Sequence, residues 1–121
     1  PHLFSSAASD VYKRQMLDRA LDAHVAARCA SACTRAYLAG ARRSLGPNGS
    51  LGFHAYRLEL RNVHPFVDIE TEQARDRAFA RARGVSAAFL DNIHLAGADE
   101  LWIPTAPELI EAGVVHRVRS D

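Results

Sequence analysis

The chain has 121 residues, of which 48% are hydrophobic and 24% charged, and this length allows one globular domain. It contains no run of about 18 apolar residues that would span a membrane, and its two cysteines are too few for a disulfide scaffold. The formal net charge of +1 gives no electrostatic reason to expect a nucleic-acid partner.

The first fifteen residues differ in composition from the rest of the chain. Residues 5–15 read SSAASDVYKRQ, and this string resembles a translated sequencing adapter of the transposon type. Lys13 is the only lysine, whereas the chain from Met16 onward carries thirteen arginines and no lysine. We therefore expect residues 1–15 to be a non-native, adapter-derived segment. Residues 16–121 are then expected to form a partial domain that lacks its N-terminal strands.

The stretch from residue 24 to residue 60 predicts short strands around one helix. A brief strand is expected over 24–28, and the small residues of 31–39 are typical of a buried helix that ends at Gly40. Residues 46–49 read GPNG, which is a strong turn signal. A buried strand is expected over 51–54, and the alternating polarity of 56–60 indicates another.

A long helix is predicted over residues 68–83, beginning at Asp68 or Thr71 and ending at Gly84. Its expected core stripe consists of Ile69, Ala74, Ala78, Phe79 and Ala82. Its basic residues are interpreted as a solvated face in preference to a nucleic-acid surface; they are Arg75, Arg77, Arg81 and Arg83.

The C-terminal third predicts a helix over 85–95, a strand over 101–103, a further helix and a final strand over 114–118. Thr105 and Glu108 have the spacing of a capping box, with Pro107 in the first helical turn and Gly113 at the helix end. Strands that alternate with helices favour an α/β fold with a parallel sheet.

One serine stands where a nucleophile would. Ser31 lies between two alanines at the predicted strand-to-helix junction, as in a nucleophile elbow, where small neighbours permit a sharp turn. The N–H of Ala32 at the start of the helix would face a developing oxyanion, and His54 at the end of the next strand would serve as the base. The alternative is that Ser31 caps the helix and His54 is a core histidine, and spacing alone favours this alternative.

A resemblance to a known protein family favours the catalytic interpretation of Ser31 and His54. The segment from Ser31 through YLAG (37–40) and GPN (46–48) to LGFH (51–54) resembles the Clp protease proteolytic subunit between its nucleophilic serine and its catalytic histidine. TAPE (105–108) and EAGVV (111–115) resemble the closing helix and strand of that family. CASAC (29–33) and LWIPT (101–105) resemble most closely a group of presumed-periplasmic bacterial Clp-protease-like proteins.

The resemblance implies the C-terminal part of a Clp/crotonase-type fold with a Ser31/His54 hydrolytic centre and no cofactor or metal. The acidic triad position of the family falls on Leu101, so Asp99 is the candidate that would orient His54. The upstream loop that gives the family its first oxyanion donor has no counterpart in this sequence. Loss of one such donor costs on the order of a hundredfold in rate, so the chain itself is expected to be inactive.

The two cysteines flank the candidate nucleophile. In an extended segment the Cα atoms of Cys29 and Cys33 would lie about 13 Å apart, too far for a disulfide, although a bend at Ser31 would shorten that distance. Two packed thiols are the favoured interpretation, and a disulfide that braces the elbow is the alternative. A zinc site with His54 lacks the usual second ligand pair.

The function expected first is that of a Clp-protease-like serine hydrolase fragment acting on a peptide or another acyl compound. The alternative is a non-catalytic binding or scaffold protein of the bacterial envelope, which the leucine at position 101 favours. An acyl-CoA enzyme of the crotonase type is a weaker third, because such sites do not need a Ser/His pair at this spacing. The resemblance also implies a periplasmic or envelope location and a homo-oligomer that assembles through residues 68–95. A nucleic-acid partner is not expected, because the net charge is close to zero. Trp102 is interpreted as a core residue, and four further histidines as surface or packing residues: His24, His64, His94 and His116.

Overall fold

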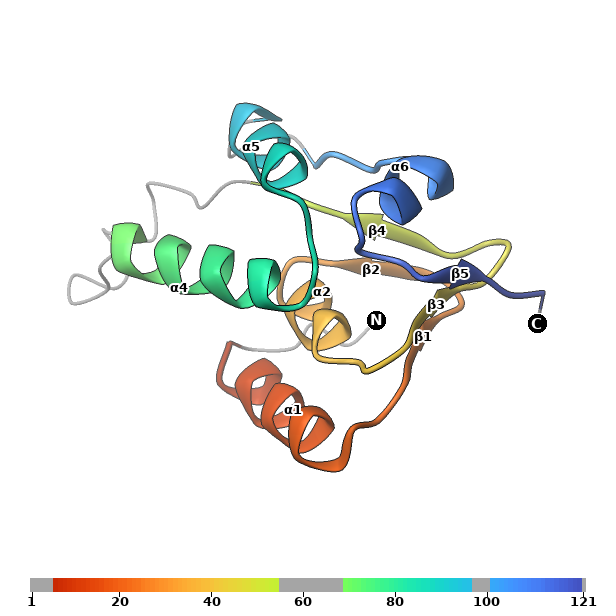
Figure 1. Cartoon of the computed structure of the whole chain (residues 1–121), viewed down its shortest axis with the longest axis horizontal. Helices are drawn as coiled ribbons and strands as arrows, with labels where there is room; N and C mark the ends of the chain where they lie inside the picture. The colour runs from red at the N-terminus through yellow and green to blue at the C-terminus, as the bar shows by residue number, and fades with distance from the viewer. Residues whose placement is uncertain (1–5, 55–68, 97–100, 121) are drawn as a thin grey trace.

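The structure, a computed structural model, describes residues 6–54, 69–96 and 101–120 (Figure 1). The helices are α1 (Ser6–Arg19), α2 (Ala32–Leu38), α4 (Ile69–Ala82), α5 (Ala87–Ala96) and α6 (Ala106–Glu111). The strands are β1 (Ala23–Val25), β2 (Arg28–Ala30), β3 (Arg43–Leu45), β4 (Ser50–Gly52) and β5 (Arg117–Val118). Some of the predictions concern residues outside these described ranges, namely residues 56–60, His64, Asp68 and Asp99.

The strands form two small parallel sheets, so the predicted α/β fold with parallel strands is confirmed. One sheet has the order β1-β3-β5, and the other pairs β2 with β4. The helices α5 and α6 lie on one side of the strands, and α1 and α2 lie on the other (Figure 1). Parallel neighbours need crossover connections, which is why helices separate the strands along the chain.

The C-terminal strand predictions were too long. In place of a strand over 101–103 there is a single antiparallel bridge, in which Phe53 and Trp102 exchange two backbone hydrogen bonds of 2.8 Å. Of residues 114–118, only Arg117 and Val118 form a strand. Val114 and Val115 instead close the turn after α6, where both backbone N–H groups donate to the carbonyl of Leu109.

One hydrophobic core lies between the strands and helices. Its members are Val25, Cys29, Tyr37, Leu38, Leu45, Leu51, Phe53, Ala80, Val85, Phe89, Leu109, Ala112, Val114 and Val115. Trp102 packs against this core, and its ring centroid lies 5.0 Å from that of Phe89. The hydroxyl of Tyr37 donates a 2.8 Å hydrogen bond to the carbonyl of Ser44, which ties α2 to β3, and burial raises the pKa of Tyr37.

The predicted core stripe of α4 was right at Phe79, which packs against the core, and wrong at its alanines. Ala80, which was not in the predicted stripe, is only 2% exposed. Ala74, Ala78 and Ala82 are exposed, and Phe79 is half-buried. Alanine recurs on several faces of this helix, so the apolar pattern does not determine which face turns inward. Thr71 lies inside α4 and does not begin it.

The predicted capping box of α6 is confirmed. The hydroxyl of Thr105 accepts a hydrogen bond from the N–H of Glu108, whose carboxylate accepts from the N–H of Thr105 at 3.0 Å. These hydrogen bonds lower the pKa of Glu108. Gly113 ends the turn with a φ of 81°, and a Cβ there would collide with the carbonyl of Gly84, so glycine is required at position 113.

Two arginines join the ends of three helices. The Arg43 side chain is only 2% exposed and donates to the carbonyls of Leu38, Gly40, Arg83, Gly113 and Val114. Arg83 donates to the carbonyls of Leu38, Ala39 and Gly40. Both guanidinium groups therefore satisfy carbonyls at the C-terminal end of α2, where positive charge is favoured. The expectation that Arg83 belongs to a solvated face was wrong, because these carbonyls need donors.

The first helix crosses the boundary expected between residues 15 and 16. It runs from Ser6 to Arg19 without interruption, and the Lys13 ammonium lies 4.6 Å from the ring centroid of Phe79 in α4. None of the described helices is long and apolar enough to cross a membrane.

Candidate active site

Ser31 and His54 come together because they follow neighbouring parallel strands. In the register of β2 and β4, Ala30 pairs with Gly52, so Ser31 and His54 both lie just beyond the carboxyl ends of these strands. Residues at the carboxyl ends of adjacent parallel strands meet at one edge of the sheet. The Oγ of Ser31 lies 2.8 Å from the Nε2 of His54, within hydrogen-bonding distance.

The backbone at Ser31 has the conformation of a sharp elbow. Its φ of 57° and ψ of −120° are rare for a residue with a side chain and cost on the order of 1–3 kcal/mol. The serine hydroxyl does not cap α2, which overturns the alternative of a helix cap. The carbonyl of Ser31 instead accepts hydrogen bonds from the N–H and the hydroxyl of Thr34, at 3.0 and 2.6 Å. Thr34, which no sequence motif indicates, thus holds the turn that presents Ser31.

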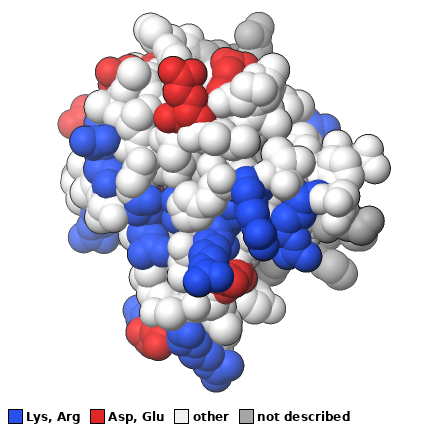
Figure 2. All heavy atoms as spheres, turned by 45° about the vertical axis from the view of Figure 1, so that its right-hand side comes forward, with Lys and Arg blue, Asp and Glu red and all other residues white. Residues whose placement is uncertain are grey.

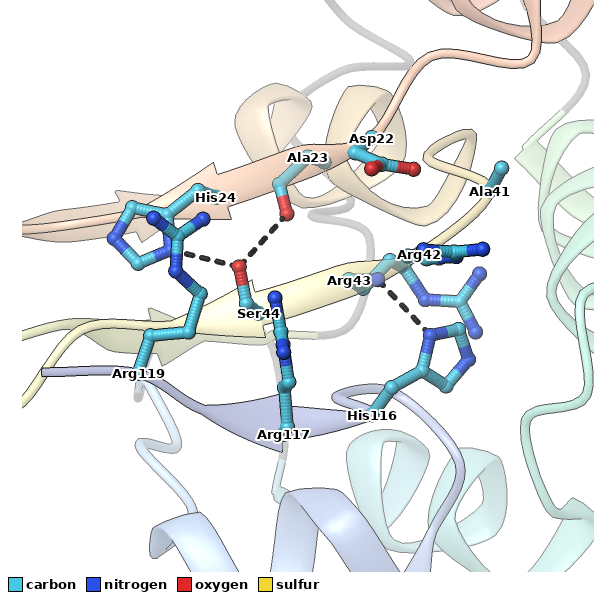
Figure 3. Close-up of a pocket in the computed structure, with 10 residues that line it drawn as sticks. All are labelled: Asp22, Ala23, His24, Ala41, Arg42, Arg43, Ser44, His116, Arg117 and Arg119. Atoms are coloured by element: carbon cyan, nitrogen blue, oxygen red, sulfur yellow. Dashed lines mark hydrogen bonds between the residues drawn. The ribbon is translucent and has the colours of Figure 1, made fainter.

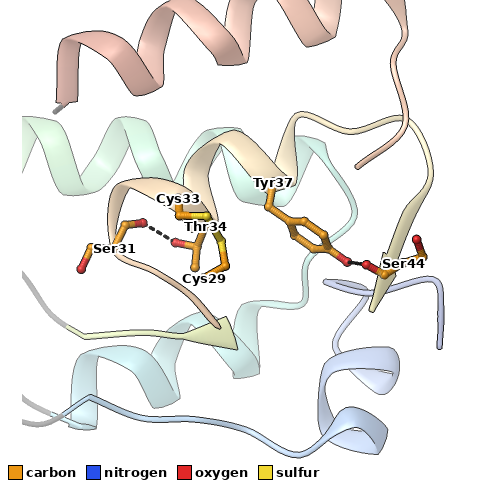
Figure 4. Close-up of a disulfide and its surroundings, with 6 residues drawn as sticks. All are labelled: Cys29, Ser31, Cys33, Thr34, Tyr37 and Ser44. Carbon is orange, nitrogen blue, oxygen red and sulfur yellow. Dashed lines mark hydrogen bonds between the residues drawn. A yellow bond between two sulfur atoms is a disulfide. The ribbon is translucent and has the colours of Figure 1, made fainter. Parts of the chain in front are cut away.

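A disulfide between Cys29 and Cys33 encloses the elbow (Figure 4). The turn at Ser31 brings the two Cα atoms to 5.4 Å, whereas an extended segment would hold them about 13 Å apart. The favoured interpretation of two packed free thiols was therefore wrong. Both sulfurs are engaged in this bond and cannot serve as zinc-binding thiolates. Among the described residues, no group of three His, Cys, Asp or Glu side chains could hold a metal ion.

The Ser31/His54 pair opens into a groove of about 970 Å³ between α2, β4, α4 and α5. Its apolar walls include Leu38, Phe53, Ala80, Val85, Phe89 and Ile93. Ion pairs line it as well, with Arg35 3.5 Å from Asp76 and Arg77 3.0 Å from Asp91. Ser31 is exposed and His54 half-buried, so a substrate carbonyl can reach the hydroxyl from this side.

The other predicted site residues are Ala32 and Asp99, and Leu101 occupies the position where the resemblance expects an acid. Ala32 is the first residue of α2 and directly follows Ser31, which is the position expected of an oxyanion donor. Asp99 lies outside the described residues. Leu101 packs over β4 so closely that a Cβ on Gly52 would come within 2.9 Å of its side chain, which would have to shift.

Two of the remaining histidines have partners that the sequence did not indicate. The Nδ1 of His116 accepts a 2.9 Å hydrogen bond from the N–H of Arg43, and the Nδ1 of His24 lies 2.8 Å from the Oγ of Ser44. Both contacts join neighbouring strands, so a single linear sequence gives no signal for them. Burial, Arg43 and Arg83 lower the pKa of His116. His94 is exposed and lines the groove.

Comparison with known proteins identifies the architecture. No protein-family model matches the chain, and no curated protein matches it. Among solved structures, a point mutant of ClpP1 from Listeria monocytogenes superposes with a TM-score of 0.70 at 20% identity, covering 97% of this chain and 68% of that one. The chain has the Clp/crotonase fold.

Two further structures share this Clp/crotonase fold. ClpP1 from Listeria monocytogenes gives a TM-score of 0.68 at 16% identity over 96% of this chain and 67% of that chain. An enoyl-CoA hydratase/isomerase from Marinobacter aquaeolei gives 0.55 at 14% identity over 95% and 39%. The fold expected from the sequence motifs is therefore confirmed, whereas a shared fold alone does not establish a shared chemistry.

Proposed function

We propose that the chain carries the Ser/His centre of a Clp-protease-like serine hydrolase that acts on a peptide or another acyl compound. The observation that carries this proposal is the 2.8 Å contact between Ser31 Oγ and His54 Nε2 at a backbone elbow. A serine hydroxyl is a weak nucleophile until an adjacent base takes its proton, and an imidazole at hydrogen-bonding distance is such a base.

In this mechanism Ser31 Oγ attacks the acyl carbon as its proton passes to His54 Nε2. The oxyanion that forms accepts a hydrogen bond from the N–H of Ala32. His54 then returns the proton to the leaving group, and a water molecule activated by His54 hydrolyses the acyl-enzyme. Asp99 is the proposed partner of the imidazole. The upstream loop that supplies the other oxyanion donor in the Clp protease family has no counterpart in this sequence, so this chain alone is expected to be inactive in turnover.

Labelling with a fluorophosphonate tests the activated nucleophile directly, because the reagent reports serine reactivity without demanding full turnover. The full chain is expected to be labelled at Ser31, as mapped by peptide mass spectrometry. Ser31→Ala should abolish labelling, and His54→Gln should slow it by about a hundredfold, since the base is lost. Ser120→Ala, which removes an exposed hydroxyl near the C-terminus, is the matched control and should label normally.

The second candidate is a non-catalytic binding or scaffold protein with the same fold. The observation that favours it is Leu101, an apolar side chain packed over Gly52 at the position where the resemblance expects an acid. A leucine cannot orient an imidazole by hydrogen bonding. Absence of labelling in the folded wild-type chain, or labelling that persists in Ser31→Ala, would support this candidate and refute the hydrolase.

We also propose an envelope location and self-association for the full protein. The Cys29–Cys33 disulfide supports the first, because disulfides persist in oxidising compartments such as the periplasm. The exposed α4–α5 pair, which the sequence resemblance associates with oligomer contacts, is the proposed surface for the second.

A further inference from the structure

A second cavity, which shares no lining residue with the groove beside Ser31, lies on the outward face of the β1-β3-β5 sheet. Its volume is about 530 Å³, within the range of small-molecule sites. It is lined by Asp22, Ala23, His24, Ala41, Arg42, Arg43, Ser44, His116, Arg117 and Arg119 (Figure 3). Neither the candidate active site nor the hydrolase mechanism uses any of these residues.

The strand register explains why polar side chains gather there. His24, Ser44 and Arg117 occupy one row across the three parallel strands, because Ser44 pairs with both of the others. Successive residues of a strand alternate between the two faces of a sheet, so Arg42 shares this face with Ser44, and Arg119 shares it with Arg117. The intervening Val25 and Leu45 turn inward and are buried.

The cavity is strongly cationic. Arg42, Arg117 and Arg119 contribute three exposed guanidinium groups against one carboxylate, that of Asp22. Figure 2 shows basic side chains gathered across the middle of the face that carries the right-hand end of Figure 1, with most of the acidic side chains in view above them. In the part of the chain that the structure describes, no ion pair or hydrogen bond engages these three guanidinium groups. The buried charge of Arg43 adds to the positive potential, and burial, Arg43 and Arg83 together lower the pKa of His116.

The donors around the cavity are pre-positioned. In Figure 3, Arg117 and Arg119 extend from the β5 side toward β3 and β1. Since the Nδ1 of His116 accepts the N–H of Arg43, the proton of the neutral ring lies on Nε2, which makes that atom a donor. Ser44 is fixed between the ring of His24 and the carbonyl of Ala23, at 2.8 and 3.4 Å.

We propose that this cavity binds a small molecule bearing phosphate, held by the guanidinium groups of Arg42, Arg117 and Arg119 and by His116. Guanidinium forks match the geometry of phosphate oxygens and bind them bidentately. Three forks and an imidazole N–H offer more donors than the two oxygens of a single carboxylate accept, which favours phosphate over a carboxylic acid. The concave shape and modest volume favour a small molecule over a macromolecular surface.

Calorimetric titration of the full chain with inorganic pyrophosphate at low ionic strength tests the proposal. We expect saturable binding of one pyrophosphate per chain. The double variant Arg117→Gln/Arg119→Gln should weaken it by about tenfold or more, since two charged donors are lost. The matched control is Arg28→Gln/Arg75→Gln, which removes two exposed arginines elsewhere and should weaken binding less than about twofold. The exposed positions of all four residues leave folding intact, which the urea midpoint verifies.

Three results would overturn the proposal. Equal weakening in both double variants would mean that pyrophosphate responds only to net charge. Tighter binding of citrate than of pyrophosphate would assign the cavity to carboxylic acids. Binding of a glutamate-rich peptide or of short DNA that depends on Arg117 and Arg119, without pyrophosphate binding, would make this face a macromolecular docking surface.

Discussion

Arg43 holds the C-terminal ends of three helices together. Its guanidinium donates to five backbone carbonyls, which belong to the ends of α2, α4 and α6. Each buried carbonyl that loses its donor costs about 1–3 kcal/mol, and a lysine can supply three donors at most, without the planar fork. We therefore expect Arg43→Lys to lower the free energy of unfolding by about 3 kcal/mol or more, measured by urea denaturation.

The neighbouring Arg42 is the matched control for this substitution. Its side chain is exposed and makes no hydrogen bond or ion pair within the described segments, so Arg42→Lys should change stability by less than about 0.5 kcal/mol. Equal effects of the two substitutions would show that charge near the sheet, and not the carbonyl network, is what Arg43 contributes.

His116 should make the fold sensitive to acid. Burial, Arg43 and Arg83 lower its pKa in the folded chain below the ordinary value of 6.5, so the unfolded chain binds this proton more strongly. The stability due to the neutral ring is complete above about pH 6.5 and is lost as the pH falls through the folded-state pKa. His116→Asn keeps an acceptor for the Arg43 N–H but cannot titrate. The urea midpoint of this variant should fall less than that of the wild type between about pH 7.5 and about pH 5.

His94→Asn provides the comparison, because His94 is exposed and its removal should leave the acid sensitivity of the wild type unchanged. If the His116 variant lost as much stability in acid as the wild type, other groups would be responsible for the pH dependence.

The conformation of the turn between β2 and α2 depends on the Cys29–Cys33 disulfide that spans it. The rare backbone conformation of Ser31 is held by this bond and by the two hydrogen bonds from Thr34. If Ser31 is the nucleophile, reduction by a phosphine should slow fluorophosphonate labelling by about tenfold or more, because small displacements of a reacting atom are costly. The variant Cys29→Ala/Cys33→Ala should label slowly with or without the phosphine. Undiminished labelling of the reduced wild type would leave the disulfide a purely structural role.

The elements that were predictable from sequence are those with local chemical signals. Thr105 and Glu108 form a capping box because both partners lie within one helical turn, and glycine marks the ends of helices. The meeting of Ser31 with His54 followed from a family resemblance and from parallel strand order. Arg43 was unpredictable, because arginine is rarely buried and its five acceptors come from distant segments. The disulfide depended on a bend whose sharpness no residue of the CASAC segment encodes alone.

The contribution of residues 1–15 to the free energy of unfolding can be measured by removing them. Residues 6–15 form most of α1, yet Val11 and Tyr12 are 58% and 48% exposed, and the contact of Lys13 with Phe79 is worth about 1 kcal/mol. A chain that begins at Met16 should therefore fold, with an unfolding free energy lowered by about 1–2 kcal/mol and unchanged labelling of Ser31. Failure of this chain to fold would show that residues 5–15 belong to the domain.

Self-association through α4 and α5 can be tested by substituting exposed apolar residues. Leu95, near the end of α5, is 80% exposed. Burial of so exposed an apolar side chain against a partner would be favourable. Light scattering with size-exclusion chromatography should give a mass above that of one chain. Leu95→Glu should reduce this mass, because a charge would be buried in the contact. Ile103→Glu is the comparison, since Ile103 is 46% exposed but lies outside both helices. A wild-type chain that stays monomeric at all concentrations would show that there is no such contact. Equal effects of the two substitutions would place the contact outside α5. In either case the groove beside Ser31 would open directly to solvent on its α5 side.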